Sequence, residues 1–332
     1  MQKTVWKLVP NLSINSREEL LDCYRSSLEA LNRSPKTISW YLEILRRFFS
    51  FLDSGKSMKP INELGPQELR AYILDLQKAT KWANSPNITE AKGPLSPYSI
   101  QGHVRAVKAF WSWLLEEGYI EENPLMKFPL PKVPKNIVKT LTIEQAKQLL
   151  KRIDRHTPIG AKYYSILLLI LDAGPRVSEV VGIKMSDIDM AHCCVKVIGK
   201  GSKERIIPFH KFTKKQLLHY LKTFRPQLCE KDSPYLFPDC DGEHISINSV
   251  QQFLRRLANK VDLQGAKVSA HIIRHTFATL YLAKGGSDLA LMEIMGHASI
   301  QTTQKYTHLQ PQHLQHLHAK LSPVEDLTRG KL

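Results

Sequence analysis

The chain has 332 residues, enough for one large or two ordinary domains with a substantial hydrophobic core. Hydrophobic residues make up 42% of the sequence and charged residues 23%, as in soluble globular proteins. No apolar run is long enough to cross a membrane, and the N-terminus lacks the apolar segment of a signal peptide. These features exclude a membrane-spanning protein and predict a soluble, cytoplasmic one.

The charge balance points to a polyanionic partner. Lys and Arg (47) outnumber Asp and Glu (31), which gives a formal net charge of +16. Nucleic acid is favoured over an anionic membrane, because no basic amphipathic helix with a bulky apolar face is apparent. The cysteines include no C-x-x-C pair and are odd in number, which predicts reduced thiols rather than a disulfide framework or a zinc site. They are Cys23, Cys193, Cys194, Cys229 and Cys240.

The N-terminal part of the chain predicts a helical domain. Ser16 and Glu19 form a capping-box pattern at the start of a helical hairpin over residues 16–53. Pro35 is expected to start the second helix of this hairpin, and Pro66 opens a third helix. Apolar residues recur on one face of each segment, as in helices that pack on a common core.

A fourth helix is predicted from about Ser99 to Glu117, after a polar loop over residues 82–97. Three aromatic residues of this helix could stack on bases, but their helical spacing favours the core. These residues are Phe110, Trp111 and Trp113. Arg105 and Lys108 on the same helix are the better candidates for contact with DNA.

A linker separates this domain from the rest of the chain. Residues 124–139 contain four prolines and several lysines, which cannot hold a helix or a central strand. Such an extended basic segment could follow a nucleic-acid backbone or serve only as a solvated connector. We therefore expect a first domain over 1–123, a linker over 124–140, a second domain over 141–321 and a flexible tail over 322–332.

The second domain predicts helices and one β-hairpin. Thr142 caps a helix, and a buried helix over 163–171 ends at Gly174. A short helix follows Arg176. Residues 194–198 and 205–209 are β-rich runs around a glycine-containing turn, and they predict a hairpin with a cationic tip. The remainder is mainly helical.

Six side chains of the second domain are suited to chemistry on a phosphodiester: Arg176, Lys200, His271, Arg274, His297 and Tyr306. Attack on a phosphodiester develops negative charge on its equatorial oxygens, and guanidinium groups bind such oxygens in pairs. Imidazole and ammonium groups can transfer the protons of the attacking and leaving oxygens. A tyrosine can attack when nearby cations make its phenolate accessible.

Four segments of the second domain resemble the signature boxes of tyrosine recombinases: AGPRVSEV, VIGKGSKERIIPF, HIIRHTFATLYL and LMEIMGHASIQTTQKYTHL. The similarity is greatest to Xer-type enzymes and phage-type integrases. SPKTISWYLEILRRFFSFL and VKAFWSWLLEEGYIEENP resemble the helical core-binding domain of that family. The resemblance implies a multidomain α and α+β protein. A SAM-like helical core-binding domain would precede a mainly helical catalytic domain with a small antiparallel β-sheet.

The resemblance also implies roles for the proton-transferring residues. Tyr306 would attack the phosphodiester and form a 3′-phosphotyrosyl bond with a free 5′-OH. Lys200 would be the general acid for the 5′ oxygen, and His271 would assist proton transfer at the tyrosine. Neither ATP nor a metal is implied, so no cofactor is expected. Lys203 is an alternative to Lys200 as the phosphate-binding lysine, and Lys203 and Arg205 are further DNA-binding candidates.

By the same resemblance, Arg176 and Arg274 would hold the scissile phosphate, while His297 would bind a non-bridging oxygen. His297 could instead cap a helix. Glu179 would support the site from one turn after Arg176, and weaker supporting candidates are Thr276 and His308. Pro175 departs from the family pattern, which usually has an apolar residue there. Proline is tolerated in the first turn of a helix, so we expect unchanged chemistry.

The expected assembly is a homotetramer on double-stranded DNA, possibly with a related recombinase or accessory factor, that exchanges strands through a Holliday junction. A helix over 311–321 could dock in a neighbouring subunit or in its own. Alternatives are a relaxing topoisomerase, a hairpin-forming resolvase, a non-catalytic DNA-binding protein and a metal-dependent transposase. His271 and His275 have the spacing of a zinc pair, but Ile272 replaces the glutamate of a metalloprotease.

Overall fold

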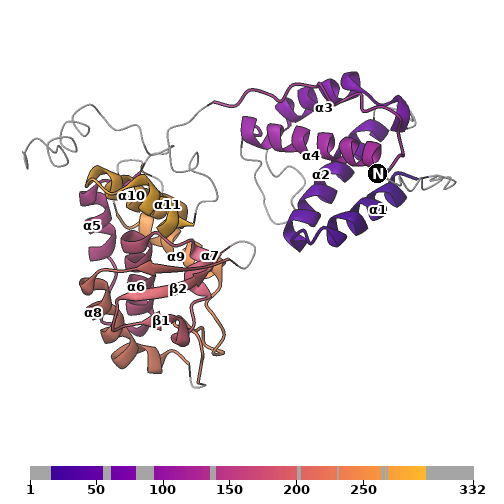
Figure 1. The fold of residues 1–332 in the computed structure, drawn as a ribbon. Coiled ribbons are helices and arrows are strands. Elements are labelled where there is room, and N and C mark those ends of the chain that lie inside the picture. The colour runs from indigo at the N-terminus through magenta and orange to yellow at the C-terminus, as the bar shows by residue number, and fades with distance from the viewer. Residues whose placement is uncertain are drawn as a thin grey trace, which may run out of the picture. The chain divides into compact units, whose positions relative to one another are not determined.

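The chain divides into two compact units, residues 1–136 and 137–332 (Figure 1). The computed structural model describes residues 16–54, 61–79, 93–134, 140–199, 203–229, 232–261, 263, 266 and 268–296. Within these ranges, none of the helices combines the length and the apolarity that a membrane span requires.

The regular elements described in the first unit are all helices (Figure 1). Its α-helices are α1 (Arg17–Ala30), α2 (Pro35–Ser54), α3 (Pro66–Lys78) and α4 (Pro97–Glu116), and a short 3-10 turn spans Ile61–Glu63. The side chain of Ser16 accepts a hydrogen bond from the Glu19 amide at 3.2 Å, which caps α1 as expected. The other three helices begin on prolines, whose missing N–H has no partner to lose at that position. The predicted hairpin and third helix are confirmed, and α4 begins two residues earlier than expected.

Aromatic side chains form the centre of the first unit. The rings of Phe110 and Trp113 stack with centroids 5.5 Å apart, and Phe48 meets Tyr72 edge-on at 5.0 Å. Phe110 and Trp111 are at most 1% exposed. These residues therefore belong to the core, as the helical spacing predicted, and not to a surface that could stack on bases.

A half-buried histidine is expected to couple the stability of the first unit to pH. The Tyr72 hydroxyl and His103 Nδ1 lie 2.9 Å apart. Burial and then the charge of Arg47 lower the pKa of His103 from 6.5 to about 4. The unfolded chain therefore binds more protons than the folded chain between these values. We expect the stability of this unit to fall by about 1–2 kcal/mol as the pH drops from about 6.5 to about 4.

This pH dependence can be measured by tryptophan fluorescence during urea unfolding, because all five tryptophans lie in the first unit. They are Trp6, Trp40, Trp82, Trp111 and Trp113. The variant His103→Gln keeps a hydrogen-bonding side chain without a titratable ring, so it should lose the decline over that window. An unchanged decline in the variant would show that other groups cause it.

Residues 124–134, predicted as linker, pack on the first unit. Leu125 and Phe128 are 1% and 8% exposed and join its core. The ammonium of Lys108 donates to the carbonyls of Met126 and Phe128, the former at 3.1 Å, and Gln101 donates to Pro131 O at 2.8 Å. The segment has neither helix nor strand over 128–134, as expected, but it belongs to the first unit. Residues 135–139 lie outside the described part.

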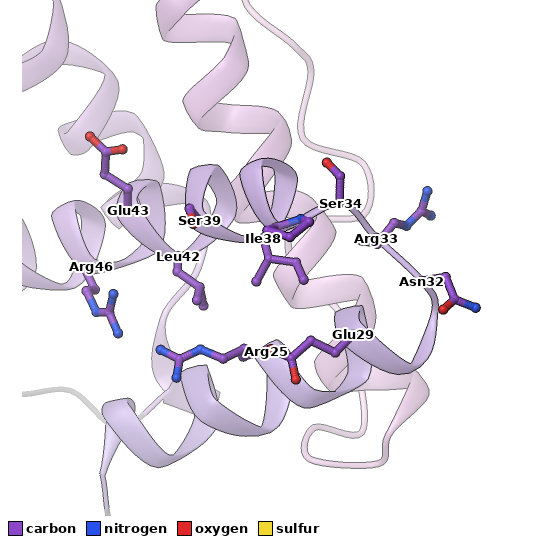
Figure 2. A pocket seen from close by; sticks show the side chains of 11 residues that line it. Arg25, Glu29, Asn32, Arg33, Ser34, Ile38, Ser39, Leu42, Glu43 and Arg46 are labelled. Atoms are coloured by element: carbon purple, nitrogen blue, oxygen red, sulfur yellow. The ribbon is translucent and has the colours of Figure 1, made fainter. Parts of the chain in front are cut away.

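A groove of about 850 Å³ lies between α1 and α2 in the first unit (Figure 2). Ile38 and Leu42 of α2 point into it, and charged residues of both signs line it, including Arg25, Glu29 and Arg46. None of the candidate residues named from the sequence lines this groove.

The second unit surrounds a long buried helix, α6 (Pro158–Ala173), which packs against α10 (Ala270–Ala283). The other α-helices described in this unit are α5 (Ile143–Lys151), α7 (Val177–Val181), α8 (Lys211–His219), α9 (Ile247–Ala258) and α11 (Asp288–Met295). Short 3-10 turns span Met185–Asp187 and Arg225–Gln227, and a π turn spans Tyr220–Phe224. Thr142 forms the predicted capping box with Gln145 at the start of α5.

A small antiparallel sheet lies in the second unit, with the strand order β1-β2-β3. Its strands are β1 (Ile188–Asp189), β2 (Cys194–Ile198) and β3 (Glu204–Pro208). Val195 pairs with Ile207, and Val197 pairs with Arg205. The predicted hairpin is confirmed, and the two-residue β1 is an addition that its shortness hid from the sequence pattern. Side chains alternate along β3, so Ile207 is buried while Ile206 is exposed.

Candidate active site

The site includes the C-terminal end of α6, where Gly174 adopts a left-handed backbone conformation. Gly174 ends α6 with φ 64° and ψ 29°. A Cβ at this position would lie 2.3 Å from Cδ1 of Phe277. Pro175 follows, and Arg176 is the N-cap residue of α7 in extended conformation. Pro175 therefore precedes α7 and does not lie in its first turn, which corrects the expectation from the sequence. Arg176 therefore lies at the N-terminal end of α7.

Alanine at position 174 should destabilise the second unit. A non-glycine residue is strained at this φ, and its Cβ would overlap the Phe277 ring, so we expect a loss of about 2–4 kcal/mol. Urea unfolding followed by far-UV circular dichroism measures the loss. Gly182→Ala is the matched control, because Gly182 has φ −84° and its Cβ would lie 3.6 Å from the nearest atom. Equal stability of the two variants would contradict the prediction.

Glu179 lies beneath the Arg176 side chain and is 4% exposed. Its carboxylate accepts from the Arg176 amide at 2.7 Å and from Arg176 Nη1 at 2.8 Å. It also accepts from Arg205 Nη1 at 2.9 Å and Nη2 at 2.8 Å. Burial alone would raise the pKa of Glu179, but these hydrogen bonds and the charge of Arg205 bring the pKa below its ordinary value. An ionised carboxylate thus supports two guanidinium groups, in line with the supporting role expected for it.

Helix α10 carries His271 and Arg274 on one face, three residues apart. The side chain of Ser269 caps this helix by accepting from the Ile272 amide at 3.2 Å. Arg274 is 5% exposed; its Nη1 donates to Gly174 O and its Nη2 to Met295 O, the latter at 2.7 Å. His271 is exposed at the start of the helix.

Three arginines from three different elements converge on the C-terminal end of α11. The acceptors are the successive carbonyls of Ile294, Met295 and Gly296. Arg205 Nε donates to the first at 2.8 Å, Arg274 Nη2 to the second at 2.7 Å, and Arg176 Nη2 to the third at 3.3 Å. Carbonyls at a helix C-terminus carry partial negative charge, so this end of α11 attracts cations.

The structure brings Arg176 and Arg274 together, as predicted. Lys200, His297, Tyr306 and His308 lie outside the described residues, although their neighbours Gly199 and Gly296 lie at the site. The ideal Cβ position of Gly199 is 3.3 Å from Glu179 Oε1, and that of Gly296 is 2.9 Å from Arg205 Cζ. The chain therefore approaches this cluster just before Lys200 and again just before His297.

The other candidates lie in different environments. Arg105 on α4 and Lys203 before β3 are exposed, whereas Lys108 is half-buried. The side chain of Thr276 accepts from the Leu141 amide at 3.0 Å and is fully buried, which indicates a role in joining α10 to the start of the unit. All five cysteines are free thiols. In the described ranges, no group of three or more His, Cys, Asp or Glu side chains could hold a metal ion.

Arg205 has a position that the sequence reasoning missed. It was predicted to face DNA, but its side chain is 13% exposed and bonds within the protein. Strand alternation could have indicated this position, since Arg205 and the apolar Ile207 are two residues apart on the same face of β3. Contact of Arg205 with DNA stays a prediction.

Comparison with known proteins matches both units. Residues 139–313 match the model described as "Phage integrase family", and residues 20–121 match "Phage integrase, N-terminal SAM-like domain". Tyrosine recombinase XerC of Oceanobacillus iheyensis is 30% identical over 93% of this chain and 98% of its own length. Tyrosine recombinase XerD of Listeria innocua is 28% identical over 87% of this chain and 93% of its own.

A solved structure shares the fold. The XerH site-specific recombinase, in a post-cleavage complex with palindromic difH substrate, matches with a TM-score of 0.69 and 21% identity. The match covers 92% of this chain and 88% of that one. The helical N-terminal unit and the small antiparallel sheet agree with these similarities. The chain therefore belongs to the phage integrase family and is an Xer-like tyrosine recombinase, an enzyme of site-specific DNA recombination.

Proposed function

We propose that the enzyme cleaves and rejoins duplex DNA through a covalent bond between Tyr306 and a 3′ phosphate. The observation that carries this proposal is the convergence of Arg176 and Arg274 on the end of α11. The chain continues from there to His297 and Tyr306 within ten residues of Gly296. A pair of positioned guanidinium groups next to a tyrosine-bearing segment is suited to a phosphodiester substrate.

The proposed reaction conserves the energy of the phosphodiester bond in a phosphotyrosyl bond. The Tyr306 oxygen bonds to phosphorus while the bond from phosphorus to the 5′ oxygen breaks. His271 receives the phenolic proton, and Lys200 donates a proton to the leaving 5′ oxygen. Rejoining reverses these steps with the 5′-OH of the partner strand. Each cleavage is therefore followed by one ligation, and ATP is not consumed.

The two arginines differ in how they are held. Arg274 is buried and fixed by backbone carbonyls, so its charge is positioned before substrate binds. The Arg176 side chain is 34% exposed, and its Nη2 makes a long hydrogen bond of 3.3 Å to Gly296 O. This donor can turn to a phosphate oxygen while Nη1 stays on Glu179. Arg274 would thus anchor the phosphate, and Arg176 would complete its binding.

Double-stranded DNA is the proposed substrate and partner. The formal charge of +16 favours a polyanion, and the related XerH structure contains its difH substrate. Arg105 and Lys203 are the exposed candidates for phosphate contacts, so replacing either should lower the salt dependence of binding by about one counterion. Four protomers would exchange strands through a Holliday junction. Chromosome dimer resolution and the integration or excision of a mobile element are the alternative biological roles of such an enzyme.

The test is covalent trapping on a nicked duplex. Cleavage near the nick releases a short fragment that carries the 5′-OH, so the strand cannot be rejoined and the covalent adduct accumulates. A binding sequence is first selected from random duplexes, and protein–DNA adducts are then separated under denaturing conditions. We expect a protein-linked 3′ end with the wild-type enzyme, and none with Tyr306→Phe. The control Tyr281→Phe removes the hydroxyl of a half-buried tyrosine of α10 and should leave the adduct unchanged.

Three results would contradict the proposal. An adduct that persists in Tyr306→Phe would exclude this nucleophile. Cleavage that needs a divalent metal and leaves no adduct would indicate a metal-dependent transposase. Relaxation of supercoiled DNA that lacks the selected sequence would indicate a topoisomerase.

A further inference from the structure

Arg205 joins three parts of the second unit. It is a residue of β3, its Nη1 and Nη2 bind both carboxylate oxygens of Glu179, and its Nε donates to Ile294 O at 2.8 Å. All three nitrogens of the guanidinium are thus engaged by elements other than its own strand. A planar fork can make this set of bonds, whereas a lysine ammonium cannot.

Two glycines leave room for this guanidinium. Cβ atoms at Gly296 would lie 2.9 Å from Arg205 Cζ, 2.9 Å from Nη1 and 3.0 Å from Nε. These similar distances show that the flat face of the guanidinium lies against Gly296, which is left-handed with φ 63°. A Cβ at Gly199 would lie 3.5 Å from Arg205 Nη1. The group therefore fills the space between the hairpin, α7 and the end of α11.

The charges explain why two arginines share one glutamate. If Arg176 alone paired with the buried Glu179, the carboxylate would cancel the charge of Arg176. Arg205 provides the second cation, so the carboxylate is balanced and Arg176 keeps charge for a phosphate. The same side chain fixes the last turn of α11, from which the chain continues to His297.

We propose that Arg205 is a positioning residue for recombination, acting through Glu179 on Arg176 and through Ile294 on the segment that leads to His297. This role rests on the proposed function. It differs from a direct contact with DNA, because nearly all of the side chain is enclosed by protein. Loss of Arg205 should therefore slow DNA cleavage more than it weakens DNA binding.

The test is a double-mutant cycle of Arg205→Met and Glu179→Gln. The rate of adduct formation is measured in single turnover at saturating protein, and the dissociation constant is measured separately on the same duplex. We expect Arg205→Met to slow cleavage about a hundredfold, as for a misplaced transition-state donor, with the dissociation constant changed less than threefold. In the Glu179→Gln background the same substitution should slow cleavage less than tenfold, because the carboxylate charge is already gone.

Two further variants complete the design. Arg205→Lys keeps the charge and most of the volume but not the fork, so it should also slow cleavage at least tenfold, and it serves if Arg205→Met fails to fold. Lys211→Met removes an exposed cation at the start of α8, away from the proposed machinery, and should leave the saturated rate unchanged.

A weaker affinity with an unchanged saturated rate in Arg205→Met would make Arg205 a DNA contact and overturn the positioning role. Full additivity of the cycle would exclude action through Glu179. If the wild-type enzyme forms no adduct, the proposed function fails. Wild-type cleavage with an unchanged rate in both Arg205 variants refutes the role of Arg205 alone.

Discussion

Arg274→Lys should slow covalent cleavage of a nicked duplex about a thousandfold. The guanidinium of Arg274 is 5% exposed and spans two acceptors, Gly174 O at the end of α6 and Met295 O at the end of α11. An ammonium group cannot span both and also present a donor to a phosphate. Loss of one preorganised donor costs a factor of about 10²–10³ in comparable active sites, and loss of the fork geometry adds to it.

The measurement is the single-turnover rate of adduct formation at saturating protein, with the dissociation constant determined in parallel. Affinity should change less than threefold, because one buried cation contributes little to the long-range attraction of a chain with formal charge +16. Arg255→Lys makes the same substitution at an exposed position of α9 and should leave the rate unchanged. A rate for Arg274→Lys within tenfold of wild type would remove Arg274 from the reaction.

Glu179→Ala should destabilise the second unit by about 3–5 kcal/mol. The Glu179 side chain is 2% exposed and accepts four hydrogen bonds from Arg176 and Arg205. Its removal leaves the Arg205 guanidinium, 13% exposed, without a counter-charge. Removing one partner of a buried ion pair destabilises a protein more than replacing both partners, because the remaining charge stays buried away from water.

The loss should appear in urea unfolding followed by far-UV circular dichroism, while tryptophan fluorescence reports the first unit and should not change. The pKa of Glu179 is lower in the folded chain than its ordinary value of 4.5. Its stabilisation is therefore complete above that value and declines as the pH falls below it. The difference in free energy of unfolding between wild type and Glu179→Gln should accordingly become smaller as the pH falls below that value. A shift of the fluorescence transition instead would contradict the assignment to the second unit.

Local signals in the sequence predicted most of the fold. Ser16, Thr142 and the prolines at helix starts act within one turn, so each can be recognised from its immediate neighbours. The β-hairpin was equally local, because two short runs of β-forming residues flank a glycine-containing turn. The expectation that Arg176 and Arg274 share one site came from the family resemblance, since no local pattern relates residues so far apart in the chain.

Long-range contacts were what the sequence could not supply. Residues 124–134 were predicted as a linker because their prolines exclude regular structure, yet Leu125 and Phe128 are buried in the core of the first unit. The convergence of three guanidinium groups on α11 depends on how α6, α10 and β3 pack, and carbonyl acceptors have no signature in a sequence. The inward position of Arg205 was missed for this reason: a cation beside a cationic turn resembles a surface residue until its partner Glu179 is known.

The register between β2 and β3 determines which face of the sheet Arg205 lies on. Arg205 is directed inward only because it pairs with Val197, while Ile206, one residue on, is exposed. A slip of β3 by one residue would turn Arg205 to solvent and bring Ile206 into its place beside Glu179. A slip by two would restore the inward direction. Shifts of this hairpin by odd numbers of residues should therefore be excluded among functional relatives, whatever the composition of the turn.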